Sequence, residues 1–355
     1  MSARVDVLLL SLGTTFGWRV ADSSFLEQLE RAGVSTRAVS VRFGAAGRLR
    51  RAYPVNDLVE ASAARRSLRS AVRRHRPRSL VISTTTAAML AESASLPYAV
   101  RLDAPASLNR PGAKNAVLHA LERRALARAA LVLPWSRAAL AALPAGSAPA
   151  VVVPPPVVRS GEPAAERERL AVAYTPDVKA KGLDILCAAW TAAAIPGARL
   201  QVFGVTPETA LSYLRRSATP VGDCIEFAGW RAPAEFRAAL RRARAYAGAA
   251  RWEDFGQAPL EALADGALLA TVPSGGPFEA LGIARELAPG LVAPSLEPPG
   301  LAAALRAAFE LPEPDARAYR GRAADRLQRF EPGAIQRVVE RDVVPALLRS
   351  GDRSP

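Results

Sequence analysis

Short aliphatic runs alternate with segments of helical periodicity along most of the chain. The first run, at 5–11, is almost continuously apolar and stops just before Gly13, which is typical of a parallel strand buried on both faces. A helical pattern at 23–32 and another apolar segment at 34–41 follow it. A strand, a helix and a strand in this order form the repeating unit of an open α/β sheet.

The same alternation predicts further strands at 79–83, 98–102 and 130–133, with helices between them. Residues 143–163 interrupt the pattern with many prolines, three of them in succession at 154–156. Such a run fits neither a helix nor a central strand. We therefore place a domain boundary there and expect domains at 1–155 and 156–332.

The α/β alternation resumes after this boundary. It predicts strands at 170–174, 199–203, 224–228, 243–247 and 268–272, and helices at 183–193, 234–242 and 259–264. The segment 332–348 predicts one more helix with an apolar stripe. The sequence thus predicts two tandem doubly wound α/β domains, each with a ligand crevice at the carboxyl ends of its strands.

The charge balance is strongly basic. The 355 residues include 47 basic and 33 acidic side chains, for a net charge of +14, and only three of the basic ones are lysines. This preference for arginine, with abundant alanine and proline, fits a GC-rich coding bias. The charge permits a phosphate, polyanion or anionic membrane partner. We expect no sequence-specific nucleic-acid binding, because the arginines are dispersed and no recognition motif accompanies them.

The scarcity of cysteine and histidine argues against a metal centre. There are two residues of each type, whereas a structural zinc site needs about four ligands at close spacing. We expect Cys187 and Cys224 to be buried and reduced. No apolar run approaches the roughly 20 residues that span a bilayer, so we expect a cytoplasmic protein.

Two of the three lysines, Lys179 and Lys181, lie in the segment KAKGLD, between a predicted strand and a predicted helix. A lysine ammonium makes a compact phosphate contact, and the start of a helix favours anions. Gly182 leaves room for such a ligand. The other interpretation of this segment is a solvated charge at a helix start.

A second candidate segment, at 251–279, reads RWEDFGQAPLEALADGALLATVPSGGPFE. Glu253 is expected in the loop before a helix and Glu261 about one turn inside it, so both carboxylates could face one cleft. Further along, Gly275 and Gly276 let the backbone approach a ligand closely. Ordinary acidic residues at a helix start remain the alternative for the glutamate pair.

The ordered motifs KGLDIL, QVFG, IEFAG, EDFGQAPLEALADG and SGGPFE resemble the donor half of the family 4 glycosyltransferases, over about 171–281. The N-terminal half resembles them more loosely. The resemblance implies the GT-B architecture, in which two Rossmann-like domains face each other across a cleft. It implies that the final segment, 333–355, packs back on the first domain.

The activity implied by the resemblance is retaining transfer of a hexose-type sugar from a nucleotide-diphosphate sugar, with no further cofactor. The acceptor hydroxyl belongs to a glycan, a lipid-linked molecule or a small molecule and binds the N-terminal domain. The donor binds the C-terminal domain, with Lys181 at its diphosphate, Glu253 near its sugar and Glu261 at its ribose. The other implied donor-binding residues are Gly13, Lys179, Gly204, Arg251, Phe255, Gly256, Gly275 and Gly276.

The chain departs from the family pattern at two positions. The arginine expected five residues before Lys181 is replaced by Pro176, and either Arg251 or Lys179 could supply its charge. The usual histidine after an N-terminal strand is missing, and we take Asp103 as the acceptor-side catalytic group. These departures leave open a non-catalytic sugar-nucleotide or polyanion-binding protein. The chain has no Asp-x-Asp triplet, which favours a metal-independent enzyme.

A further basic feature is a run of arginines, namely Arg65, Arg66, Arg69, Arg73, Arg74, Arg76 and Arg78. Arg65, Arg69 and Arg73 share one stripe, and Leu68 and Val72 share another. The basic stripe indicates either peripheral contact with an anionic membrane or a polyanion, or a merely solvated helix face.

Overall fold

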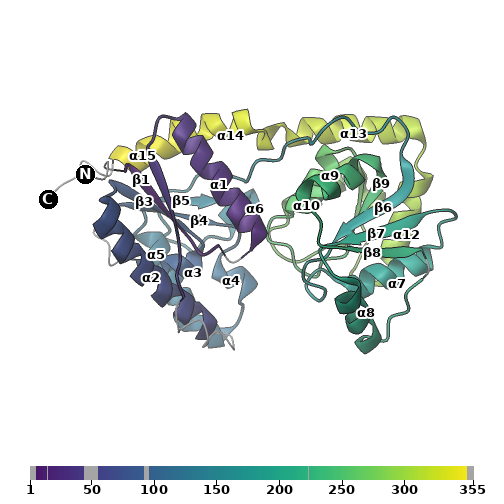
Figure 1. The fold of residues 1–355 in the computed structure, drawn as a ribbon, viewed down its shortest axis with the longest axis horizontal. Helices are drawn as coiled ribbons and strands as arrows, with labels where there is room; N and C mark the ends of the chain where they lie inside the picture. Colours follow the sequence, from purple (N-terminus) through teal and green to yellow (C-terminus); the bar gives the residue numbers. More distant parts are fainter. Residues whose placement is uncertain (1–4, 14, 44–54, 92–95, 223, 350–355) are drawn as a thin grey trace. The chain divides into compact units, whose positions relative to one another are not determined.

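The computed structural model describes residues 5–13, 15–43, 55–91, 96–222 and 224–349. The chain forms two compact units (Figure 1). The first, here called the N-terminal domain, comprises residues 1–156 and 332–355, and the second, the C-terminal domain, comprises 157–331. Both are α/β structures with a five-stranded parallel sheet.

The N-terminal sheet has the strand order β2-β1-β3-β4-β5. Its strands are β1 (Val7–Ser11), β2 (Thr36–Ser40), β3 (Ser79–Ser83), β4 (Tyr98–Leu102) and β5 (Leu131–Pro134). The order reverses between β1 and β3, and open α/β sheets bind ligands outside the carboxyl ends of their strands at such a point. Gly13 and Thr84 follow the two strands at this switch point.

The helices of the N-terminal domain cover both faces of this sheet. They are α1 (Phe16–Arg31), α2 (Val55–His75), α3 (Thr85–Ala88), α4 (Ala106–Asn109), α5 (Ala116–Ala127) and α6 (Arg137–Ala141), with a 3₁₀ turn at Ala113–Asn115. Successive side chains of a strand point to opposite faces. Leu8 and Leu10 accordingly pack with Leu68 of α2, while Val7 and Leu9 pack with α1.

The last described segment, 332–349, packs on the face of the N-terminal sheet that α1 covers. It runs as α14 (Pro332–Val338), a π-helical turn (Val339–Val343) and α15 (Val344–Arg349). Its buried residues Ile335, Val339, Val343 and Leu347 join the core formed by Val7 and Leu9. The Gln336 amide also donates to the backbone carbonyl of Gln28 in α1, at 3.1 Å.

The first helix begins earlier than the sequence pattern predicts. Helix α1 starts at Phe16 rather than at residue 23, so the connection between the first strand and the first helix is shorter than predicted. Thr15 caps the helix, and its hydroxyl accepts from the backbone N–H of Trp18 at 3.3 Å. A threonine cap satisfies an N–H that would otherwise lack a partner, and it outweighs the low helix propensity of Gly17. Thr14 lies outside the described residues.

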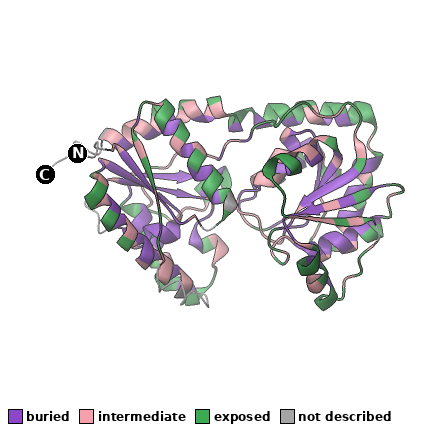
Figure 2. Ribbon diagram, in the orientation of Figure 1, coloured by how far each residue is buried: buried purple, intermediate pink, exposed green. Residues whose placement is uncertain are grey.

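The C-terminal sheet has the strand order β10-β9-β6-β7-β8. Its strands are β6 (Glu168–Tyr174), β7 (Arg199–Phe203), β8 (Ile225–Gly229), β9 (Ala243–Gly248) and β10 (Leu268–Thr271). The order reverses between β6 and β9, which makes the ends of these two strands the expected ligand site. In both domains the inner strands of the sheet are buried beneath helices whose outer faces are exposed (Figure 2).

The helices of the C-terminal domain are α7 (Leu183–Ala193), α8 (Pro207–Arg216), α9 (Pro233–Arg242), α10 (Gln257–Ala264), α11 (Glu279–Leu287), α12 (Pro298–Glu310) and α13 (Glu313–Leu327), with 3₁₀ turns at Pro289–Leu291 and Gln328–Phe330. Proline begins α8, α9 and α12, where its fixed φ suits the first turn and no N–H bond is lost.

One expectation about the cysteines is wrong. Cys187 is buried in α7, and this burial raises the pKa of its thiol to about 12. Cys224 is exposed instead, because it precedes β8, an edge strand whose residues are only partly covered. None of the helices in the described part of the chain is long and apolar enough to cross a membrane.

Candidate active site

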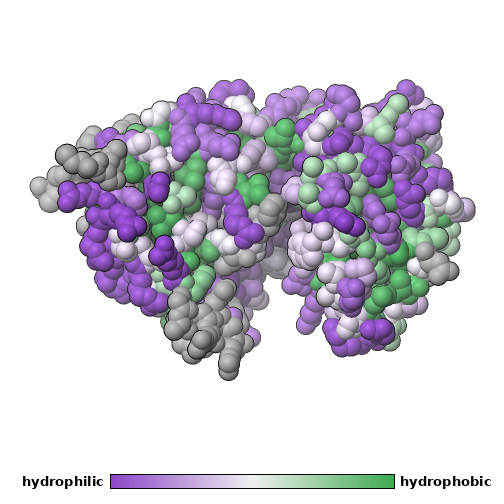
Figure 3. All heavy atoms as spheres, viewed as in Figure 1, coloured by the Kyte–Doolittle hydropathy of each residue, from purple (hydrophilic) through white to green (hydrophobic). Residues whose placement is uncertain are grey.

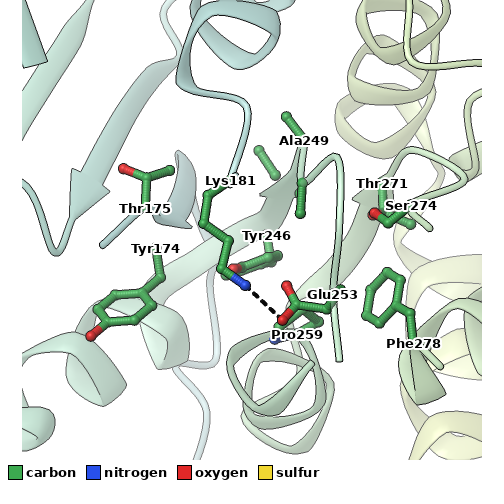
Figure 4. A pocket seen from close by; sticks show the side chains of 13 residues that line it. Tyr174, Thr175, Lys181, Tyr246, Ala249, Glu253, Pro259, Thr271, Ser274 and Phe278 are labelled. Atoms are coloured by element: carbon green, nitrogen blue, oxygen red, sulfur yellow. Dashed lines mark hydrogen bonds and ion pairs between the residues drawn. The ribbon is translucent and has the colours of Figure 1, made fainter. Parts of the chain in front are cut away.

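A pocket lies where the chain leaves β6 and β9, at the topological switch point of the C-terminal sheet (Figure 4). Thr175 follows β6, Ala249 follows β9 and Ser274 follows β10. Lys181 and Glu253 meet between these segments. The fold thus brings three loops that are far apart in the sequence to one place.

The Lys181 ammonium donates to the Glu253 carboxylate, with 2.7 Å between Nζ and Oε1 (Figure 4). The two side chains are only 24% and 15% exposed. Burial raises the pKa of Glu253, and the Lys181 charge opposes that shift. Each charge is therefore compensated mainly by the other, so a ligand that displaces one partner has to replace its charge.

Gly182 allows the lysine loop to pack closely against the end of β9. It adopts a left-handed conformation with φ +63°, and a Cβ at this position would overlap the carbonyl oxygen of Ala249. The backbone N–H of Arg251 donates to the Ala180 carbonyl at 2.9 Å. Only glycine meets both the positive φ and the close approach, which places Lys181 directly at the start of α7.

The glycine pair supports the backbone of Glu253. The Gly275 carbonyl accepts from the Glu253 N–H at 2.9 Å, and the Gly275 N–H donates to the Arg251 carbonyl at 3.1 Å. A Cβ at Gly276, whose φ is +91°, would overlap the Glu253 carbonyl oxygen. Both glycines therefore lie against the backbone of the segment 251–253.

Phe255 and Gly256 connect Glu253 to helix α10. Phe255 is buried, and its carbonyl accepts from the Glu279 N–H at 3.2 Å. Gly256 precedes α10 with φ +85°, and a Cβ there would overlap the ring of Phe278. These two residues set the path of the backbone between the two glutamates.

Glu261 lies one turn inside α10. Its Oε1 accepts from Gln257 at 3.1 Å and lies 3.7 Å from a guanidinium nitrogen of Arg237. Burial raises the pKa of Glu261, and the Arg237 charge opposes that shift. The pKa of buried Tyr246 is raised by its burial and also by the charges of both Glu253 and Glu261. The charges of both carboxylates therefore reach the phenol of Tyr246.

The two cations proposed to replace the missing arginine differ in their surroundings. Arg251 places its guanidinium on both oxygens of Asp184, at 2.9 and 2.6 Å. Lys179 is exposed, and its ammonium forms no ion pair with any residue in the described ranges. Pro176, the position of the missing arginine, is exposed as well.

Gly204 lies at the end of β7, and its N–H donates to the Gly229 carbonyl at 2.9 Å. Its φ is +83°, and a Cβ there would lie 2.9 Å from the ring of Tyr174. This close approach fixes the position of Tyr174, which lines the pocket.

The remaining two candidates, Gly13 and Asp103, lie in the N-terminal domain, after β1 and β4. The Gly13 carbonyl accepts from Arg19 at 3.0 Å. Asp103 accepts from the indole N–H of Trp18 at 3.1 Å and from the Ala104 N–H at 2.8 Å. Helix α1 thus connects the loop after β1 with the loop after β4.

Several pocket residues were not identified from the sequence. Tyr174, Thr175, Tyr246 and Ser274 all line the pocket. The Thr175 and Ser274 hydroxyls are buried and have no hydrogen-bond partner among the described residues. Thr175 and Ser274 follow the ends of predicted strands, and the rule that ligands bind at carboxyl ends of parallel strands could have indicated them.

Residues 169–310 match the family model described as Glycosyl transferases group 1. Among solved structures, the chain resembles sucrose-phosphate synthase from Thermosynechococcus elongatus, with a TM-score of 0.71 and 16% identity over 94% of this chain and 96% of that one. The fold is the GT-B fold of glycosyltransferases.

Two further GT-B structures extend the comparison. One is described as trehalose-6-phosphate from E. coli bound with UDP-2-fluoro glucose, with a TM-score of 0.68 and 11% identity over 99% of this chain and 100% of that one. The other is a UDP-forming α,α-trehalose-phosphate synthase from Burkholderia xenovorans in complex with glucose-6-phosphate, with a TM-score of 0.64 and 13% identity over 82% and 78%. No curated protein sequence matches the chain.

The family match and the GT-B fold together support a sugar-transfer function. The matched segment begins in β6 and ends in α12, so it contains Lys181, Glu253 and Glu261. Within the described ranges, no group of three or more His, Cys, Asp or Glu side chains is placed to hold a metal ion.

Proposed function

We propose that this protein is a retaining glycosyltransferase that moves a sugar from a nucleotide-diphosphate sugar to an acceptor hydroxyl. The observation that carries the proposal is the Lys181–Glu253 pair, 2.7 Å apart in a pocket at the switch point of the C-terminal sheet. This is where an open α/β sheet binds its ligand. In this proposal the C-terminal domain binds the donor and the N-terminal domain binds the acceptor.

The positively charged ammonium of Lys181 lies where the reaction develops negative charge. The bond from the anomeric carbon to the diphosphate oxygen breaks, and negative charge grows on the leaving diphosphate. Lys181 lies next to the first turn of α7, so its charge and the positive end of the helix dipole act on the same ligand. The donor diphosphate takes the place of Glu253 at Lys181.

Glu253, released from Lys181, accepts hydrogen bonds from hydroxyls of the transferred sugar. Glu261, which lies one turn inside α10, accepts from the ribose hydroxyls. The acceptor oxygen forms the new bond to the anomeric carbon while its proton passes to the leaving phosphate, so no side-chain base is required. The protein contributes mainly positioning and charge stabilisation.

The proposed substrates are consistent with what similar proteins bind. The E. coli structure is bound with UDP-2-fluoro glucose, and the Burkholderia xenovorans synthase is in complex with glucose-6-phosphate. For this chain we propose a nucleotide sugar as donor, and we assign Asp103 to the acceptor side. Asp103 is held by Trp18 at the carboxyl edge of the N-terminal sheet.

The first experiment is a thermal-shift screen of the full chain with UDP-glucose, GDP-mannose and ADP-glucose. One donor is expected to raise Tm, because a ligand at 100 times its Kd stabilises by about 2.7 kcal/mol. The stabilising donor is then tested for slow hydrolysis. We expect Glu253→Gln and Lys181→Met to abolish hydrolysis. A chain that none of the three donors stabilises would contradict the proposal.

The alternative is a non-catalytic sugar-nucleotide or polyanion-binding protein, and Pro176 at the position of the missing arginine favours it. The same screen separates the two functions. Donor binding without hydrolysis, and without transfer to sugar-phosphate acceptors, would favour the binding protein.

We further propose peripheral contact with an anionic membrane through helix α2. Leu68 is buried and Val72 is packed against the core, whereas Arg69 and Arg73 are exposed. Hydrophilic side chains gather over this helix (Figure 3). Arg69→Ser/Arg73→Ser is expected to weaken binding to phosphatidylglycerol vesicles. Equal binding of both proteins would contradict this contact.

A further inference from the structure

The guanidinium of Arg251 is already engaged by protein groups, which leaves it poorly placed to bind a phosphate. Its Nη1 donates to Asp184 Oδ1 at 2.9 Å and its Nη2 donates to Asp184 Oδ2 at 2.6 Å. The same Nη1 also donates to the backbone carbonyl of Lys179 at 2.9 Å. Tyr213 completes the cluster by donating to Asp184 Oδ1 at 3.1 Å. A bidentate guanidinium–carboxylate pair of this kind is strong and fixed in geometry.

These contacts tie together the two segments that carry the Lys181–Glu253 pair. Arg251 stands two residues before Glu253, and its backbone N–H donates to the Ala180 carbonyl at 2.9 Å. Its side chain holds the carbonyl of Lys179, one residue further back. Asp184 is the second residue of α7, just after the loop at 175–182 that carries Lys181. Arg251 thus contacts the chain on both sides of Lys181, at Lys179 and Ala180 before it and at Asp184 after it.

We propose that Arg251 is a positioning residue that places Lys181 at Glu253, and therefore at the donor diphosphate, by holding Asp184 and the Lys179 carbonyl. This inference rests on the proposed function. It separates the roles of the two cations near the pocket. Arg251 holds the loop, and the exposed Lys179 is the cation left to support Lys181 at the diphosphate.

The existing contacts of Arg251 oppose a direct role at phosphate. If the guanidinium turned toward a ligand, the Asp184 carboxylate would lose both of its short contacts with Arg251, and the Lys179 carbonyl would lose its donor. Arg251 and the polar groups around it also hold the pKa of Asp184 below its ordinary value despite partial burial. Asp184 therefore stays ionised and retains the guanidinium.

The substitution of Arg251 by lysine distinguishes holding from direct contact. Lysine keeps the charge and can still meet a phosphate, but it has no planar fork to contact two carboxylate oxygens and a carbonyl together. Arg251→Lys is therefore expected to behave like Arg251→Ala if the residue holds the loop. It is expected to behave like the wild type if the residue contacts the diphosphate.

The ligand test measures the binding of UDP and UMP by isothermal titration calorimetry to the full chain. We expect Arg251→Lys and Arg251→Ala to weaken UDP binding about tenfold, the loss of one charge-assisted contact, and to leave UMP binding unchanged. In a Lys181→Met background, Arg251→Ala is expected to add no further loss. Retention of the wild-type UDP affinity by Arg251→Lys would overturn the proposal.

The second test needs no ligand, so it separates a failure of this inference from a failure of the proposed function. Hydrogen–deuterium exchange is followed in the peptide covering 177–184. We expect faster exchange in Arg251→Ala, Arg251→Lys and Asp184→Asn than in the wild type. Unchanged exchange in all three variants would refute the holding role, whatever nucleotide the protein binds.

The matched control is Arg326→Ala. Arg326 forms an ion pair with Glu286 at 3.0 Å in the same domain, and both side chains are 59% exposed. It lies outside the pocket. We expect this variant to leave both UDP binding and exchange at 177–184 at the wild-type level, so a change in it would show that the assays respond to any lost arginine pair.

Discussion

Replacement of Lys181 by methionine tests the electrostatics of the pocket directly. Two unit charges 2.7 Å apart attract by about 6 kcal/mol at an effective dielectric constant of about 20. Desolvation of both ions offsets most of this attraction. Exposed pairs contribute about 0–1 kcal/mol, and removal of one partner from a buried pair costs about 3–5 kcal/mol. With side chains 24% and 15% exposed, we expect Lys181→Met to destabilise the C-terminal domain by about 2–3 kcal/mol at pH 8.

The loss is expected to depend on pH, because it arises from the ionised form of Glu253. Burial raises the pKa of Glu253 above its ordinary value of 4.5, and Lys181 lowers it. Between the ordinary pKa and the raised pKa of the folded state, the native state binds more protons than the unfolded state. Stability therefore falls as the pH rises through this window. Without Lys181 the pKa rises further and the window widens. The destabilisation is small at pH 4 and complete above the pKa of the folded state.

Differential scanning calorimetry at pH 4 and pH 8 measures this effect. For a domain of this size, about 2–3 kcal/mol corresponds to a fall in Tm of about 4–12 °C. The matched control is Lys181→Met/Glu253→Gln, which leaves no charge to bury and should recover most of the loss at pH 8. Equal destabilisation at both pH values, or no recovery in the double variant, would refute the electrostatic explanation.

The remaining predictions concern backbone, core and chemistry. Gly182→Ala is expected to lower the stability of the C-terminal domain by about 2 kcal/mol or more, because of the left-handed backbone and the overlap with Ala249. Gly321→Ala, inside α13 with open space around it, should instead stabilise by about 0.5–1 kcal/mol. Urea unfolding that ranks the two variants in the opposite order would contradict the geometry. Arg101→Met removes the buried partner of Asp22, 2.5 Å away, and should destabilise the N-terminal domain by about 3–5 kcal/mol, with partial recovery in Arg101→Met/Asp22→Asn by the same assay. Donor turnover is expected to continue in EDTA, since Lys181 supplies the charge; complete loss that added metal reverses would disprove metal independence.

The fold class could be predicted because the sheets in both domains are parallel and covered on two faces. Strands of this kind are nearly continuous apolar runs, and the predicted positions at 79–83, 98–102 and 199–203 agree with β3, β4 and β7. The start of α1 was misplaced because polar Ser23 and Ser24 and the flexible Gly17 hide the periodicity. The cap at Thr15 and the packing of Trp18 decide that boundary.

The sequence alone indicated where the chemistry of the C-terminal domain lies. Two lysines in an arginine-biased chain and the spacing of Glu253 and Glu261 were visible without any structure. Local sequence carries this information because a loop between a strand and a helix has a recognisable composition. It cannot say which of these residues meet.

The contacts within the site were decided by the tertiary structure. Lys181 and Glu253 are 72 positions apart, and Arg251 and Asp184 are 67 apart. They meet because β9 pairs with β6 rather than with its sequence neighbour β8. Strand order depends on how a whole sheet buries its faces, which no single segment encodes. The sequence thus determined the fold class and the chemical groups at hand, and the sheet order determined that Arg251 holds Asp184 while Lys181 meets Glu253.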